Sequence, residues 1–126
     1  MGYLKERGYR LALLTGGFDI TAQHIAVTLG IEHYRACTSC IFDIKSQSAK
    51  LISTGEERVV KLRHLQELCA QQHLPISSCA CVGDGDNNLD IFKGTGHGIA
   101  FIHSGDTVRQ VAEHTITTLS DLRNLF

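Results

Sequence analysis

The sequence lacks any long apolar run and carries almost no net charge. No stretch approaches the ~20 consecutive apolar residues that a membrane-spanning helix requires, so we expect no contact with the membrane. The formal net charge is -1, from 12 basic and 13 acidic side chains, which argues against a surface for nucleic acid or for anionic lipids. The hydrophobic fraction of 43% and the charged fraction of 20% are typical of globular proteins.

Proline and linker-like sequence are also scarce. Pro75 is the one proline, and no segment reads as a linker, a repeat or low-complexity sequence. A length of 126 residues suits one domain. We therefore predict a single domain over residues 1–126.

A secretory signal and a paired set of cysteines are both missing. The first ten residues carry charge without an apolar core, so they do not resemble a signal peptide. An odd number of cysteines without such a signal predicts a reducing, cytoplasmic compartment. Cys37 and Cys40 have CxxC spacing, but a zinc site would need a second ligand pair. We expect structural thiols and keep a redox role for this pair as the alternative. The five cysteines are Cys37, Cys40, Cys69, Cys79 and Cys81.

Apolar periodicity alternates between strand and helix along the chain. This alternation predicts an α/β domain with a mostly parallel sheet and helices on its faces. Residues 31–57 are the least clear part. Predicted strands lie at 9–14, 79–82, 98–102 and 115–117, with short ones possible at 34–37 and 40–43; predicted helices lie at 2–8, 22–29, 59–69, from 89, and at 106–113 and 119–125; residues 44–58 read as loop or hairpin.

The first polar turn, Thr15-Gly16-Gly17, follows an apolar strand that we expect to be buried on both faces. The two glycines allow the backbone to approach a ligand closely. The next helix presents unpaired N–H groups at its start, and together with a threonine hydroxyl they form a suitable phosphate cradle. The simpler alternative is a tight strand-to-helix turn without a ligand.

The second polar turn has the sequence Gly83-Asp84-Gly85 and also follows an apolar strand. Mg²⁺ prefers oxygen ligands, commonly one or two carboxylates with water and substrate phosphate, and Asp84 suits that role. The next polar residues, 86–88, could cap the following helix instead. Lys61 starts the helix that leads to this strand; it could neutralise a phosphate, although taken alone it reads as a solvated lysine.

The order of these elements resembles the phosphoserine phosphatase branch of the haloacid dehalogenase superfamily. The matching stretches are "ERGYRLALLTGGFDITAQHIAVTLGIEHYRA", "EERVVKLRHLQELCAQQHLPISSCACVGDGDNNLDIF" and "GTGHGIAFI". The resemblance implies a Rossmann-like three-layer α/β/α core and a Mg²⁺-dependent phosphomonoester hydrolase. The resemblance implies that the Thr15 hydroxyl and the Gly16 N–H bind the phosphoryl group that is transferred. It also implies that Lys61 neutralises negative charge, that Asp84 binds the metal, and that Asn87 belongs to the hydrogen-bond network around the phosphate and water.

Two departures from the family pattern stand out. Asn88 occupies a position where the family usually has Asp, so metal affinity or lysine orientation should be weaker at this second metal-site residue. The nucleophilic motif, DxDxT, is absent from the sequence. In the family, the strand that carries it lies between the strands that here precede Thr15 and Asp84. We therefore expect a truncated core with a rearranged sheet, a homo-oligomer that covers the open edge, or a separate N-terminal fragment that completes the sheet.

The sequence thus predicts a phosphoserine phosphatase-like domain that acts on a small phosphorylated metabolite and has little or no activity alone, because it lacks the nucleophilic aspartate. The alternative is a non-catalytic module that binds a phosphorylated ligand or another protein.

Overall fold

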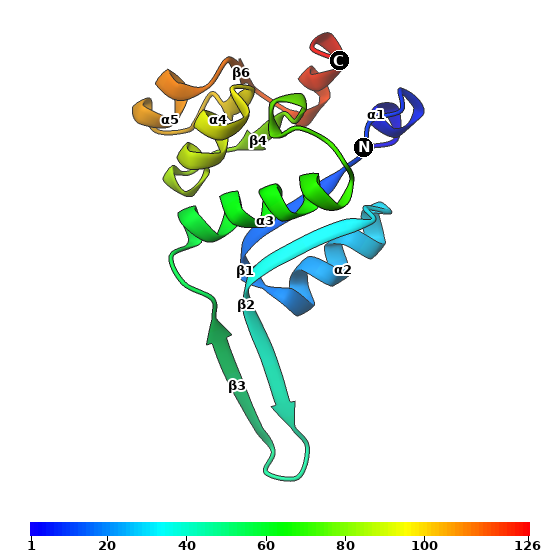
Figure 1. Ribbon diagram of the computed structural model, residues 1–126, viewed down its shortest axis with the longest axis vertical. Coiled ribbons are helices and arrows are strands. Elements are labelled where there is room, and N and C mark those ends of the chain that lie inside the picture. The colour runs from blue at the N-terminus through cyan, green and yellow to red at the C-terminus, as the bar shows by residue number, and fades with distance from the viewer.

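The computed structural model describes residues 1–126 and contains two three-stranded sheets (Figure 1). The first sheet has the order β1-β2-β3 and the second has the order β4-β5-β6. All neighbouring strands are parallel except β2 and β3, which form a hairpin. The strands are β1 (Ala12–Phe18), β2 (His33–Asp43), β3 (Ser48–Ser53), β4 (Cys81–Gly83), β5 (Gly98–Phe101) and β6 (His114–Ile116).

The predicted helices are present, with ends that differ by a few residues. The last segment is a 3-10 helix rather than an α-helix, and two further 3-10 turns flank β4. None of these helices has the length and apolar character to span a membrane. The helices are α1 (Gly2–Glu6), α2 (Asp19–Leu29), α3 (Glu57–Gln71), α4 (Leu89–Thr95) and α5 (Asp106–Val111), with 3-10 helices η1 (Ile76–Ser78), η2 (Asp86–Asn88) and η3 (Leu119–Asn124).

Helix α2 packs on the first sheet through its smallest side chains. Ala22 and Ala26 are each 1% exposed, and they lie on the stripe that the helical period predicts. Ile25 and Leu29 share that stripe but remain more than one-third exposed. The helix ends at Gly30, whose left-handed φ of 63° suits glycine.

Helix α3 lies between the two sheets and contacts both halves of the molecule (Figure 1). It packs against β1 and β2 on one side and against α4 and η2 on the other. The helix starts at Glu57, so Lys61 lies in its second turn. The prediction that Lys61 starts this helix is therefore wrong. This helix thus contacts both the strand that carries Thr15 and the 3-10 helix that follows Asp84.

Strands β1 and β4 are not hydrogen-bonded to each other, and each lies at the edge of its sheet. The mostly parallel sheet that we predicted is thus divided in two, between the strands where the family pattern places the missing strand. The prediction that the first strand is buried on both faces is also wrong, since no residue of β1 is fully buried. A strand with only one neighbour keeps one edge of its backbone open, which accounts for this exposure.

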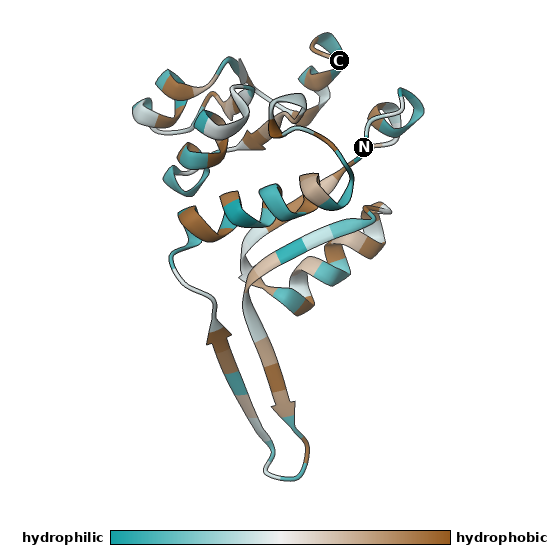
Figure 2. Ribbon diagram, in the orientation of Figure 1, coloured by the Kyte–Doolittle hydropathy of each residue, from teal (hydrophilic) through white to brown (hydrophobic).

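The hairpin of β2 and β3 projects away from the rest of the molecule (Figure 1). The two short strands considered for residues 34–43 are one continuous strand, and the polar segment after it forms the return strand. Figure 2 shows hydrophobic segments in both arms of this hairpin. Its exposed apolar side chains are Ile41, Phe42, Ile44, Leu51 and Ile52.

The best-packed core belongs to the second sheet. One buried cluster joins Leu89 and Phe92 of α4 to Ala100 and Val108, and another lies on the opposite side, around Ile99. The two termini meet beside this second cluster (Figure 1). The other members of the second cluster are Ile116 and Leu122, with Leu4, Val82, Phe101, Leu125 and Phe126 packed against them.

Candidate functional site

Strand β1 ends in an irregular turn that faces helix α3. The strand continues through Gly16 and Gly17 to Phe18, so the predicted stop at Thr15 is wrong. Its register with β2 shifts between Thr15 and Phe18, as at a β-bulge. The Gly17 N–H donates to the Thr15 hydroxyl oxygen at 3.1 Å, which holds this hydroxyl at the turn.

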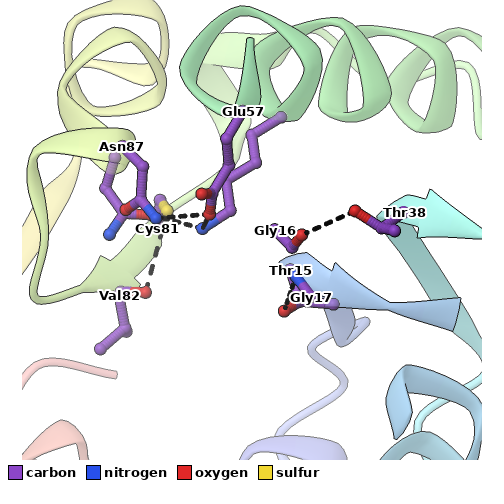
Figure 3. Close-up of polar contacts among 10 residues, drawn as sticks. Thr15, Gly16, Gly17, Thr38, Glu57, Cys81, Val82 and Asn87 are labelled. Carbon is purple, nitrogen blue, oxygen red and sulfur yellow. Dashed lines mark hydrogen bonds and ion pairs between the residues drawn. The ribbon is translucent and has the colours of Figure 1, made fainter. Parts of the chain in front are cut away.

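A carboxylate from α3 lies against this turn. The carboxyl group of Glu57 is so close to Gly16 that any side chain at that position would overlap it. The same carboxylate forms an ion pair with Lys61 at 3.4 Å and accepts a hydrogen bond from the Asn87 amide. Figure 3 shows Glu57 reaching from α3 into the space between the end of β1 and Asn87. One negatively charged group thus contacts Gly16, Lys61 and Asn87 together.

The Lys61 side chain is buried, with 7% of the residue exposed. Besides Glu57, its ammonium group contacts the Asn88 side-chain oxygen at 3.4 Å. A buried charge is stable only when it is paired and hydrogen-bonded, so both partners matter to the stability of the fold. The simpler interpretation of Lys61 as a solvated lysine does not describe this structure.

Asn88 is buried beneath the polar turn that follows β4. Its amide packs directly on Gly83, where a β-carbon would overlap it. The side-chain oxygen of Asn88, which we predicted as a metal ligand, accepts a hydrogen bond from the Lys61 ammonium group in this structure. The neighbouring Asn87 has a buried side-chain oxygen without a hydrogen-bond partner.

The predicted site residues form a central group and a flanking group. The central group is in mutual contact through Glu57 and Lys61. In the flanking group, Thr15 and Gly17 bond to each other, whereas Asp84 is exposed just after β4. The central group is Gly16, Lys61, Asn87 and Asn88, and the flanking group is Thr15, Gly17 and Asp84.

The oxygen donors in the turn after β4 suit a hard cation that keeps most of the water molecules bound to it. No group of three or more His, Cys, Asp or Glu side chains gathers into a metal site. The available oxygen donors are the exposed Asp84 carboxylate and the unpartnered Asn87 oxygen. Mg²⁺ commonly binds through one or two protein oxygens together with water and substrate phosphate. The residues present are therefore compatible with Mg²⁺ held jointly with a phosphate.

Glu57 is the site residue that sequence reasoning missed. An acidic side chain in the first turn of a helix normally serves the helix dipole. The sequence feature that could have identified Glu57 is its spacing from Lys61, because Glu and Lys four residues apart lie side by side on a helix. That spacing predicts an ion pair, but it does not predict that the pair faces Gly16.

Several known proteins with similar sequences are phosphoserine phosphatases. Residues 1–96 match the haloacid dehalogenase-like hydrolase family. The phosphoserine phosphatase of Streptomyces coelicolor is 33% identical over 114 residues, which are 89% of this chain and 27% of that protein. The phosphoserine phosphatase of Streptococcus thermophilus is 32% identical over 114 residues, which are 90% of this chain and 52% of that protein. The chain thus spans about half or less of the length of these relatives.

Solved structures agree with the sequence matches. A substrate-bound phosphoserine phosphatase complex has a TM-score of 0.80 and 28% identity, covering 98% of this chain and 58% of that chain. A phospho-aspartyl intermediate analogue of phosphoserine phosphatase has a TM-score of 0.78 and 26% identity, covering 98% of this chain and 59% of that chain. The chain belongs to the haloacid dehalogenase-like hydrolase family, in its phosphoserine phosphatase branch.

Proposed function

We propose that these 126 residues form the phosphate- and cation-binding part of a Mg²⁺-dependent phosphomonoester hydrolase, with a small phosphate monoester such as phosphoserine as substrate. The observation that carries this proposal is the carboxylate of Glu57, which lies between Gly16, Lys61 and Asn87. A site that accommodates one oxyanion, with a buried ammonium and an amide donor around it, suits the oxygens of a phosphoryl group.

Each residue of the site has a role in this proposal. The Thr15 hydroxyl and the backbone at Gly16 and Gly17 hold the phosphoryl oxygens, and Lys61 offsets their negative charge. Asn87 donates to the phosphate through the amide group that here donates to Glu57. Catalysis of phosphoryl transfer depends mainly on such positioning and charge neutralisation.

Asp84, with an asparagine oxygen beside it, would hold Mg²⁺ at the carboxyl end of β4. The cation would supply further charge neutralisation at the phosphate when it is bound. Since the Asn88 oxygen already accepts from Lys61, the unpartnered oxygen of Asn87 is the better candidate for the second donor or for a metal-bound water.

The nucleophilic aspartate would come from outside residues 1–126. Strands β1 and β4 each have an open edge, and α3 contacts both halves of the molecule. A strand between β1 and β4 would join the two sheets into one three-layer α/β/α core, of which these residues form a single, partial domain.

An N-terminal segment carrying DxDxT is our proposed source of this strand; a second copy of the chain could cover the open edges but would bring no nucleophile, because the sequence lacks DxDxT. Without the strand, turnover should be absent or very slow. We propose a cytoplasmic location, on the odd number of cysteines in the sequence.

A phosphatase assay with phosphoserine and Mg²⁺ tests the proposal. The chain is assayed alone and after fusion to a phosphoserine phosphatase segment that carries DxDxT. We expect turnover from the fusion and not from the chain alone, and loss of at least 100-fold in the Lys61→Ala fusion. Lys93→Ala, which removes an exposed lysine of α4, serves as the matched control. A folded fusion that shows no turnover would contradict the proposal.

A non-catalytic module remains the alternative function, because Glu57 already occupies the oxyanion position. Such a module would bind inorganic phosphate or phosphoserine without turnover, in the chain alone and in the fusion. Isothermal titration with phosphoserine, combined with the assay above, separates the two functions.

A further inference from the structure

Two cysteines that are distant from the candidate site have their sulfur atoms in contact. The Sγ atoms of Cys69 and Cys79 are 3.4 Å apart. Cys69 lies in the last turn of α3, and Cys79 precedes β4, so the contact joins the helix that carries Lys61 to the strand before Asp84. We propose that Cys69 and Cys79 form a reversible intramolecular disulfide when the protein meets a disulfide oxidant such as oxidised glutathione.

The backbone on both sides of the pair is held in place. The Leu74 N–H donates to the Cys69 carbonyl at 2.9 Å, and the Cys79 N–H donates to the Ile76 carbonyl at 3.0 Å. These bonds shape the short connection between α3 and β4 so that the two sulfurs stay opposed. A disulfide needs a sulfur separation of about 2.05 Å, so the atoms must approach by roughly 1.4 Å, which is within the reach of cysteine side-chain rotation.

The two thiols differ in a way that gives them separate roles. Cys79 is partly exposed, whereas Cys69 is 6% exposed. Burial, together with the neighbouring Cys79 thiol, raises the pKa of Cys69 to about 11, so Cys69 is protonated at neutral pH. Cys79 is therefore the residue that an oxidant reaches first, and Cys69 is the residue that completes the bond.

The chemistry proceeds in two exchange steps. The Cys79 thiolate attacks one sulfur of oxidised glutathione, which forms a mixed disulfide and releases one glutathione thiolate. Cys69 then loses its proton to solvent and attacks the Cys79 sulfur of the mixed disulfide. This second step releases the other glutathione. The two cysteines are thereby oxidised, and the oxidant is reduced to two molecules of glutathione.

The other cysteines are poorly placed for such a bond. Cys37 and Cys40 both belong to β2, and residues three apart in a strand point to opposite faces. The CxxC pair considered from the sequence is therefore not the redox pair of this fold. Cys81 lies two residues after Cys79, where a disulfide between neighbours in an extended segment would be strained.

The experiment treats the folded chain with oxidised glutathione and counts free thiols by alkylation and mass spectrometry. We expect two of the five thiols to disappear in a monomer that keeps no glutathione, and dithiothreitol to restore them. Digestion of the untreated and oxidised chains should identify Cys69 and Cys79 as the two residues. This measurement needs no variant, so it does not depend on how a substitution folds.

Variants then test the order of events. Cys69→Ser should retain one glutathione on Cys79, because no second thiol displaces it, whereas Cys79→Ser should gain neither a disulfide nor an adduct at Cys69. Cys81→Ser, the matched control, should behave like the unmodified chain. Five remaining thiols, a bond between Cys37 and Cys40, or a disulfide between two copies would each overturn the proposal.

Discussion

The carboxyl group of Glu57 lies directly against Gly16, so the first turn of α3 touches the turn at the end of β1. This contact connects the first sheet to the turn that follows β4 of the second sheet, because the Glu57 carboxylate also accepts a hydrogen bond from Asn87. An anionic side chain at this position has two consequences. It stabilises the buried Lys61, and it competes with any external oxyanion for the same donors.

Removal of this negative charge should strengthen phosphate binding. We expect Glu57→Gln to bind inorganic phosphate roughly tenfold more tightly than the unmodified chain, because Lys61 then lacks its anionic partner. Isothermal titration at low ionic strength measures the change. Glu67→Gln, on the exposed face of the same helix, is the control and should leave the affinity unchanged. Weaker binding by Glu57→Gln would indicate that this residue supports the site instead of competing for it.

A side chain at Gly16 should destabilise the protein through Glu57. We expect Gly16→Ala to lower the free energy of unfolding by about 1 kcal/mol, because the Glu57 carboxyl group, at the end of a flexible side chain, must move away from the new β-carbon and from Lys61. Urea denaturation measures this loss. Gly17→Ala is the matched control, since its β-carbon would meet only the Thr15 hydroxyl at 3.4 Å. The loss should shrink when Glu57→Ala is added, and equal losses in both backgrounds would refute the contact as its cause.

Mg²⁺ should strengthen phosphate binding through Asp84. We expect phosphate affinity to rise several-fold when millimolar Mg²⁺ is added, because cation and phosphate share ligands. Asp84→Asn should abolish that increase while it leaves phosphate binding without Mg²⁺ nearly unchanged. Asp86→Asn removes a neighbouring exposed carboxylate and serves as the control. Isothermal titration with phosphate, with and without Mg²⁺, measures these affinities. If Mg²⁺ still raises the phosphate affinity of Asp84→Asn, the cation binds elsewhere.

Alkaline pH should destabilise the fold through Cys81. Burial raises the pKa of Cys81 from 9.0 to about 11 in the folded protein. Between these values the unfolded chain loses this proton while the folded chain keeps it, so stability is full below pH 9 and falls as the pH rises toward 11. The loss from this group should be on the order of 2 kcal/mol.

Urea denaturation at pH 8 and pH 10.5 measures this effect. Cys81→Ala should show a smaller decrease between the two pH values, although its stability at pH 8 is itself lower. Lysines and the other cysteines titrate in the same range, so the difference between the variant and the unmodified chain is the relevant quantity. Identical pH dependence in both proteins would exclude Cys81 as a source.

Local patterns in the sequence were sufficient for the α/β class and for most helices. Ala22 and Ala26 recur at the helical period and are buried, and Gly30 ends their helix as expected. Asp121 forms a capping box with Thr118 at the start of η3, a contact between residues three apart. These features depend on neighbours within a few residues, which is why they can be read from the chain alone.

Other features depend on contacts between distant segments. Residues 33–53 form one projecting hairpin, although the sequence suggested only short strands followed by a loop or hairpin. Strand β1 is half exposed because its backbone has only one neighbouring strand, and an apolar sequence alone does not reveal which neighbours are present. The division of the sheet, in contrast, lies where the resemblance to the family places a missing strand.

The residue types of the candidate site were determined by the sequence itself: a Thr-Gly-Gly turn, a helical lysine and a Gly-Asp-Gly turn, in that order. Only the tertiary structure decided that Glu57 lies among them and that Cys69 contacts Cys79. Both contacts arise where α3 packs between two sheets, so they depend on the orientation of one helix relative to distant strands. Spacing along the chain carries no information about that orientation.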